Sequence, residues 1–320
     1  MRNTNLRKFL IISILLFCLY FVQFKKNQQD SMLNNIEKIN ISSSSLLSTP
    51  KIKLKIVMPF HLTQLEILLE NIKKWEIFKL CYFENDKSIE LIFYIGYFKS
   101  NLTSLNYLPK KIKCFSKIST VLYKYKSLNE DKHVIGSRLM FESMLLKTND
   151  YFKNAWFIFY MEPDARPIKS NWLDAISNEI GNGNFWCKGS VFRGDLSTFE
   201  TNSNIFSKLF ENTYIPNYLH INGNAIYNIG DNEFILFYFN LLRPYIVKKN
   251  GFSLTAYDTD FFEYLIDKNN YETTRNIFHK FHFTDLIQNY WHTEFKINEV
   301  ALKYKNTYFV HGGKPVYKIL

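Results

Sequence analysis

The sequence predicts an α/β domain built on a mainly parallel sheet, preceded by one transmembrane helix. Two observations predict the domain: runs of apolar residues typical of buried strands alternate with segments in which apolar residues recur at helical spacing. A third observation, one long apolar segment near the N-terminus, predicts the transmembrane helix. The chain has 320 residues, of which 47% are hydrophobic and 22% charged, so a disordered protein is excluded.

The first fifty residues are predicted to anchor the domain to a membrane. Residues 9–24 are almost wholly apolar and flanked by basic residues, which makes them just long enough to cross a thin bilayer. No cleavage site of small residues follows, so we interpret them as an uncleaved signal anchor rather than a cleaved signal peptide. Residues 1–8 would then be a cytosolic tail, 25–50 a polar stem and 51–320 a lumenal domain. This organisation predicts a single-pass type II protein of the Golgi or endoplasmic reticulum membrane.

Two glycosylation sequons and a pair of cysteines bear on the same topology. The sequons begin at Asn40 and Asn101, in the predicted stem and in a predicted polar loop, and both would be glycosylated only in a secretory lumen. Cys81 and Cys114 flank one stretch of the predicted sheet and could pair in an oxidising lumen. The sequence leaves open whether they form a disulfide or remain buried thiols.

Strands and helices follow one another from residue 51 onward. The predicted elements are, in order, a strand at 53–60, a helix at 64–78, a strand at 89–95, a helix at 131–146, a strand at 155–161 and a helix that begins at 170. The strand at 155–161 is continuously hydrophobic, as expected of a central strand covered on both faces. After residue 181 the pattern is less regular, and we interpret that half as an elaboration of the same domain.

The sharpest local feature is the acidic turn Glu162-Pro163-Asp164, which directly follows the strand at 155–161. Ligands of open α/β sheets bind beyond the carboxyl ends of the strands. Carboxylate oxygens on a proline-stiffened turn are ligands that Mg²⁺ and Mn²⁺ prefer. The simpler alternative is a solvated loop in which Arg166 pairs with one of the acids.

Three later segments carry further polar groups. Asn222-Gly223-Asn224 is a glycine turn in which Gly223 would let the backbone approach a ligand, although an ordinary hairpin would look the same. Asp258 and Asp260 stand at the start of a predicted helix, where they could cap the helix or supply a general base. His311 ends a late predicted strand beside glycines, and a lone histidine is more often structural than a ligand.

The order of these features resembles the GT-A class of nucleotide-sugar glycosyltransferases, over about residues 51–313. In that class the first strand ends in a loop near the nucleoside, which Phe60 and His61 match. A metal motif of two acids one residue apart follows a central strand, which Glu162 and Asp164 match. The first acid is usually Asp, whereas this chain has Glu. The last acid of the motif often binds the metal directly, so the resemblance favours Asp164 as the main ligand.

The later segments match the remaining parts of that pattern. The turn at residues 222–224 resembles the acceptor loop, and His311 resembles the late histidine that completes the metal site. The acids at the helix start resemble the motif that carries the base of an inverting enzyme, for which Asp260 is the first choice and Asp258 the second. A retaining enzyme would need no such base. Arg166 would assist at the phosphates.

The resemblance implies a Rossmann-like GT-A nucleotide-diphospho-sugar transferase fold and a hexosyl- or related transferase. Such an enzyme moves a sugar from a nucleotide-sugar donor to a glycan, glycoprotein or glycolipid acceptor, assisted by Mn²⁺ or Mg²⁺. The alternative is a catalytically inactive, membrane-anchored glycan-binding protein of the same fold. The net charge of +11 would also suit a nucleic-acid-binding protein. The predicted anchor and the lack of a nucleic-acid-binding motif argue against such a partner.

Overall fold

The computed structural model describes residues 53–75, 77–82, 89–181, 183–194, 219–251, 255–290, 293–312 and 314–315. The predicted cytosolic tail, signal anchor and stem, with the sequon at Asn40, lie outside these residues. Among the residues that are described, no helix combines the length and the apolar character that a membrane span requires.

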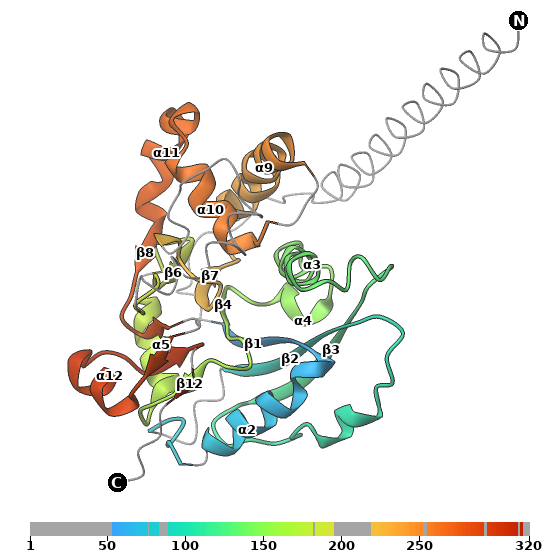
Figure 1. Ribbon diagram of the computed structural model, residues 1–320, viewed down its shortest axis with the longest axis vertical. Helices are drawn as coiled ribbons and strands as arrows, with labels where there is room; N and C mark the ends of the chain where they lie inside the picture. The colour runs from blue at the N-terminus through green and yellow to red at the C-terminus, as the bar shows by residue number, and fades with distance from the viewer. Residues whose placement is uncertain are drawn as a thin grey trace, which may run out of the picture. The chain divides into compact units, whose positions relative to one another are not determined.

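The central sheet has seven strands in the order β3-β2-β1-β4-β7-β6-β8 (Figure 1). The strands are β1 (Leu54–His61), β2 (Glu90–Tyr97), β3 (Lys117–Lys124), β4 (Phe157–Tyr160), β6 (Cys187–Gly189), β7 (Ala225–Asn228) and β8 (Phe281–Phe283). Neighbouring strands are parallel except at β7, which is antiparallel to both β4 and β6. The predicted α/β class with a mainly parallel central sheet is therefore confirmed.

Helices cover both faces of this sheet because its central strands are apolar on both sides. Along β1, Ile56 and Met58 belong to one core cluster, whereas Val57 between them belongs to the other. The first cluster is covered by α2 (Leu65–Trp75) and α5 (Trp172–Ile180). The second is covered by α3 (His133–Leu145), α9 (Arg243–Asn250) and α10 (Tyr257–Ile266). Figure 1 shows α2 and α3 on opposite sides of β1 and β2. The continuous hydrophobic run of β4 follows from this double cover.

A smaller three-stranded sheet lies next to the acidic turn. It contains β5 (Arg166–Pro167), β11 (Phe309–His311) and β9 (Ile287–Asn289), in the order β5-β11-β9. Strand β11 is antiparallel to β5 and parallel to β9. The pairing of residues 309–310 with residues 166–167 brings the end of the chain beside the turn that follows β4. The sequence predicts a late strand ending at His311, which β11 matches, but not its pairing with β5 and β9, which are only two or three residues long.

The remaining elements are short. They are α4 (Asp150–Lys153), α8 (Asn232–Leu236), a π-helix (Phe237–Leu242), α11 (Tyr271–Ile277), α12 (Ile297–Lys303) and the parallel pair β10 (Glu294–Phe295) and β12 (Lys314–Pro315). Short 3₁₀ turns precede or follow several helices, at Leu62–Gln64, Thr103–Tyr107, Lys268–Asn270 and Phe278–Lys280.

The predicted element boundaries differ from the observed ones for local reasons. The helix expected at 64–78 begins at Leu65, after a 3₁₀ turn that the side chain of His61 caps. The helix expected from residue 170 begins at Trp172 because Asn171 takes a left-handed conformation, with φ 61°. The strand expected at 155–161 pairs over residues 157–160 only.

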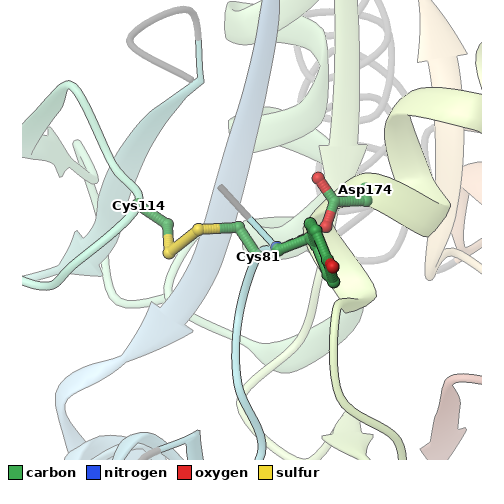
Figure 2. Close-up of a disulfide and its surroundings, with 4 residues drawn as sticks. Cys81, Cys114 and Asp174 are labelled. Carbon is green, nitrogen blue, oxygen red and sulfur yellow. Dashed lines mark hydrogen bonds between the residues drawn. A yellow bond between two sulfur atoms is a disulfide. The ribbon is translucent and has the colours of Figure 1, made fainter. Parts of the chain in front are cut away.

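A disulfide joins Cys81 to Cys114, the pairing that the sequence left open. Their Cα atoms are 6.1 Å apart, and 33 positions separate them in sequence. The bond ties the segment after α2 to the segment before β3. Figure 2 shows Asp174 of α5 close to this bond, where its Oδ2 accepts a hydrogen bond from the backbone N–H of Tyr82 at 2.7 Å. The third cysteine of the described part, Cys187, is a buried thiol.

Candidate active site

Two carboxylates and an imidazole converge where β4 and β11 end. Glu162 and Asp164 lie in the turn after β4, and His311 is the last residue of β11. The Nε2 atom of His311 lies 2.9 Å from Glu162 Oε2 and 3.3 Å from Asp164 Oδ1. One ligand atom from each side chain lies within 4.8 Å of the other two. The structure thus brings together the three residues that the sequence predicts as metal ligands.

Contacts with α2 and with β11 hold the acidic turn in place. Asn71, a buried residue of α2, donates from Nδ2 to the carbonyls of Pro163 at 3.0 Å and Ala165 at 2.6 Å. Immediately afterwards Arg166 pairs with Val310 of β11. Asn71 belongs to none of the sequence motifs described above. The signal was an asparagine on the buried face of an amphipathic helix, because a buried amide must find partners for its hydrogen bonds.

His311 is only 4% exposed, and both of its ring nitrogens have partners. Its Nδ1 lies 3.1 Å from Asn289 Oδ1, an acceptor that orients the ring and points Nε2 toward the acids. Burial lowers the pKa of His311, but the carboxylates of Asp164 and Glu162 outweigh burial and raise the pKa to about 10. For Asp164, burial works to raise the pKa, but the charge and hydrogen bond of His311 hold it below its ordinary value. Without a metal, the cluster is therefore a protonated imidazole between carboxylates.

This donor set fits a divalent cation. Two carboxylates suit Mg²⁺ and Mn²⁺, and an added imidazole is a ligand that Mn²⁺ accepts more readily than Mg²⁺. A cation would replace the proton on His311 Nε2, while Nδ1–H could continue to donate to Asn289. The protein has thus already gathered the charges that a cation in this position would neutralise.

Asn224 joins the glycine turn to the acidic turn. This fully buried residue accepts a hydrogen bond at Oδ1 from the backbone N–H of Glu162 at 2.7 Å. Its Nδ2 donates to Glu162 Oε2 and to Asn222 Oδ1, both at 2.8 Å. The turn at residues 222–224 therefore fixes the orientation of one predicted metal ligand.

A side chain at position 223 would collide with a residue of the neighbouring helix α10, so only glycine fits there. A Cβ at this position would lie 2.3 Å from the Tyr257 hydroxyl oxygen, at the start of α10. The close approach expected at this glycine is thus made by the protein's own tyrosine. Contact with α10 places the glycine turn against the acids at the start of that helix.

Asp258 is held by several hydrogen bonds beside the glycine turn. Its Oδ2 accepts from the backbone N–H of Gly223 at 2.9 Å and lies 3.3 Å from His220 Nε2, and its Oδ1 accepts from the N–H of Thr259 at 3.0 Å. Burial works to raise its pKa, but the charge and hydrogen bond of His220 and the backbone donors lower it below the ordinary value. The sequence motifs gave His220 no role, although it lies only two residues before the glycine turn.

Asp260, the first choice for a general base, is not brought to the cluster. Its side chain is 0% exposed, and its Oδ2 lies 2.8 Å from Nη1 of Arg243, whose Nε lies 2.9 Å from Glu142 Oε1. Burial raises the pKa of Asp260 to about 6, although Arg243 opposes the rise. An acid sealed in a salt bridge between helices has no access to a substrate hydroxyl. We therefore assign Asp260 a structural role.

The other predicted donor-binding residues have separate positions. Phe60 is buried in the core cluster on the α2 face and has no surface on which a base could stack. His61, at the carboxyl end of β1, is partly exposed, and its Nε2 lies 3.2 Å from Asp131 Oδ1. Arg166 is half-buried, and within the described part of the chain its Nη1 is enclosed without a hydrogen-bond partner. After the larger effects of burial and of His311, the charge of Arg166 also acts to lower the pKa of Asp164.

Neither protein-family models nor curated protein sequences match this chain. Solved structures that resemble it include the galactosyltransferase LgtC in complex with donor and acceptor sugar analogues, at 12% identity and a TM-score of 0.46, covering 81% of this chain and 86% of that one. Another is mouse xyloside xylosyltransferase 1, at 14% identity and a TM-score of 0.44, covering 81% and 97%. A third is the mannosyltransferase Ktr4p from S. cerevisiae, at 12% identity and a TM-score of 0.37, covering 72% of each chain.

Proposed function

We propose that this protein is a metal-assisted glycosyltransferase. It would move a sugar from a nucleotide-sugar donor to a glycan, glycoprotein or glycolipid acceptor. The observation that carries the proposal is the convergence of Glu162, Asp164 and His311 at the carboxyl end of a central parallel strand. Nearby, Nη1 of Arg166 has no hydrogen-bond partner among the described residues. Carboxylates, an imidazole and a guanidinium at that edge are suited to a cation and a diphosphate together.

The chain's own residues divide the work of transfer. Glu162, Asp164 and His311 would hold Mn²⁺ or Mg²⁺, which when bound supplies positive charge to stabilise the departing nucleoside diphosphate. Arg166 would donate from Nη1 to a phosphate oxygen. His61, at the carboxyl end of β1, would lie near the nucleoside, with Phe60 supporting that loop from the core.

The proposed setting is a single-pass type II protein of the Golgi or endoplasmic reticulum membrane, with its catalytic domain in the lumen. The disulfide between Cys81 and Cys114 supports an oxidising compartment, because such bonds are rare in reducing ones. The exposed sequon at Asn101 agrees with that setting.

Thermal unfolding in the presence of donors tests the proposal. The melting temperature would be measured with and without Mn²⁺ across UDP-galactose, UDP-glucose, UDP-xylose and GDP-mannose. A bound donor at one hundred times its Kd stabilises the native state by about 2.7 kcal/mol, which raises the melting temperature by roughly 5 °C in a domain of this size. We expect one donor to produce such a shift, and only when Mn²⁺ is present.

Two variants make this test specific. Asp164→Asn should abolish the Mn²⁺-dependent shift, whereas Asp150→Asn, at a highly exposed acid on α4, should retain it. A donor shift of equal size in Asp164→Asn would contradict the metal site. If no donor shifts the wild-type protein, the catalytically inactive glycan-binding alternative would replace the enzyme.

A further inference from the structure

His220 and Asp258 form a carboxylate–imidazole pair next to the candidate metal cluster. His220 Nε2 lies 3.3 Å from Asp258 Oδ2, and the two side chains are 17% and 13% exposed, so both are largely sheltered yet reach the surface. No metal ligand belongs to the pair. Neither the predicted ligand set nor the proposed metal and donor contacts assign His220 a task.

Two consecutive residues connect this pair to the cluster. The backbone N–H of Gly223 donates to Asp258, and the side chain of its neighbour Asn224 binds Glu162. The glycine turn therefore connects the pair directly to Glu162, a ligand of the proposed cation. A donor whose diphosphate is held at the cluster would present its sugar close by, because the sugar is bonded directly to that diphosphate.

Asp258 itself is poorly suited to accept a proton. Two backbone N–H groups and His220 already direct hydrogen bonds at its two oxygens. Such bonds favour the ionised carboxylate, and the pKa of Asp258 is correspondingly lowered. An imidazole held by a buried carboxylate is a better acceptor, because the carboxylate orients the ring and stabilises the imidazolium that forms.

We propose that His220, oriented by Asp258, accepts the proton of the acceptor hydroxyl during sugar transfer. The acceptor oxygen forms a bond to the anomeric carbon of the donor, and the bond from that carbon to the diphosphate oxygen breaks, with its electron pair leaving on the phosphate. The proton passes to the imidazole of His220 and then to solvent. This inference rests on the proposed function and makes the enzyme an inverting one. Asp258 is the positioning residue.

The test uses water as the acceptor, so that the natural acceptor need not be known. Release of nucleoside diphosphate would be measured with Mn²⁺ and the donor that gives the thermal shift. In His220→Gln, the amide can still donate to Asp258 but cannot accept the proton. We expect at least a hundredfold loss of kcat with an unchanged donor shift. His279→Gln, at an exposed histidine beyond α11, should leave kcat unaltered.

Chemical rescue separates a proton acceptor from a structural residue. Adding free imidazole should restore part of the activity of His220→Ala, but none of the activity of Asp164→Asn. Asp258→Asn should lower kcat without lowering donor affinity, and imidazole should not restore it. Near-normal kcat in His220→Gln, or no rescue of a folded His220→Ala, would overturn the inference while leaving the glycosyltransferase intact. If wild-type protein bound no donor, the proposed function itself would fail first.

Discussion

At the scale of single residues, neutral amides shape the candidate site around its charged groups. Asn71 holds the acidic turn, Asn224 holds Glu162 and Asn289 holds His311. An amide both donates and accepts hydrogen bonds without adding a charge. A lysine or an aspartate in the same place would change the local charge. The net charge that a bound cation would meet therefore comes from the cluster of Glu162, Asp164 and His311 and not from these amides.

The protonation of His311 gives a prediction on pH. Its pKa is raised to about 10 in the metal-free protein, so the imidazole carries a proton at neutral pH, and a cation must displace that proton. The apparent affinity for Mn²⁺ should therefore rise with pH, by up to tenfold per unit, until the pH passes about 10. Calorimetry at pH 7.5 in buffers of different ionisation enthalpy should detect about one proton released per Mn²⁺. Binding without proton release would contradict it.

At the scale of elements, a buried ionic network joins three helices on one face of the sheet. Glu142 of α3, Arg243 of α9 and Asp260 of α10 meet around a single guanidinium. Arg243 lies nearer to Glu142 than Arg138 does, at 2.9 Å against 3.8 Å, and it also pairs with Asp260. Burial without a partner would penalise the charges of both acids. The network explains why the charged residues are acceptable beside a cluster of aliphatic and aromatic side chains.

Removal of Arg243 should destabilise the protein strongly. Arg243→Met leaves two buried acids without their shared partner, at a cost of about 3–5 kcal/mol. The free energy of unfolding would be measured in urea, with Arg275→Met as the control, at an exposed arginine paired with Glu272. If both substitutions lowered the free energy of unfolding by the same small amount, the network would not contribute to stability.

Asp260→Asn separates a structural role from catalysis. It should lower the free energy of unfolding by about 1–3 kcal/mol, since it weakens a buried charge-assisted hydrogen bond. Under conditions where the variant stays folded, its kcat for nucleotide release should match that of wild type. A large loss of kcat in the folded variant would restore Asp260 as the base.

The sequence could predict the elements in which apolar residues recur with the period of a helix or form a continuous apolar strand. β1, β2, β4, α2 and α3 lie within two or three residues of their expected ends, because each buries a long apolar face. The sheet of β5, β11 and β9 has strands too short to show a period. Its strands pair only through the tertiary fold. The contact of His311 with the acids followed from the resemblance, whereas periodicity could not have indicated it.

The choice between the two acids of α10 shows which signal was available. Tyr257, Phe261 and Tyr264 are buried and recur at helical spacing, and Asp260 lies on the same side of the helix. Asp258, two positions earlier, points to a different side. The helical pattern thus indicated that Asp260 faces the core. The partners Glu142 and Arg243, distant in sequence, could be found only in the structure.

At the scale of the whole molecule, the disulfide between Cys81 and Cys114 relates stability to redox environment. It closes a loop with a sequence separation of 33, which corresponds to about 3–4 kcal/mol of stabilisation in the chain-entropy account. Cys81→Ser with Cys114→Ser should lower the free energy of unfolding by that amount, and wild type reduced with dithiothreitol should behave alike. Cys187→Ser provides a control at a buried thiol outside the disulfide. No loss in the double variant would show that the bond does not contribute to stability.

The exposed sequon tests the proposed topology. Asn101 lies on the surface between β2 and a 3₁₀ turn, where its side chain accepts a hydrogen bond from the Thr103 N–H. Protein from a eukaryotic secretory host should lose mass on endoglycosidase treatment, and Asn101→Gln should remove one glycan. Protein from the cytosol of the same host should not change. An unmodified Asn101 in secreted protein would contradict the lumenal assignment.

The reversed direction of β7 has a consequence for how the proposed enzyme could diversify. Gly189 at the end of β6 pairs with Ala225 at the start of β7, and Ala225 also pairs with Tyr160 at the end of β4. Both ends of the connection between β6 and β7 are thereby fixed at the rim where the acidic turn lies. If the proposed function is right, a longer connection or one of different sequence can change which acceptor binds. The donor-binding residues and the strands that carry them would stay the same.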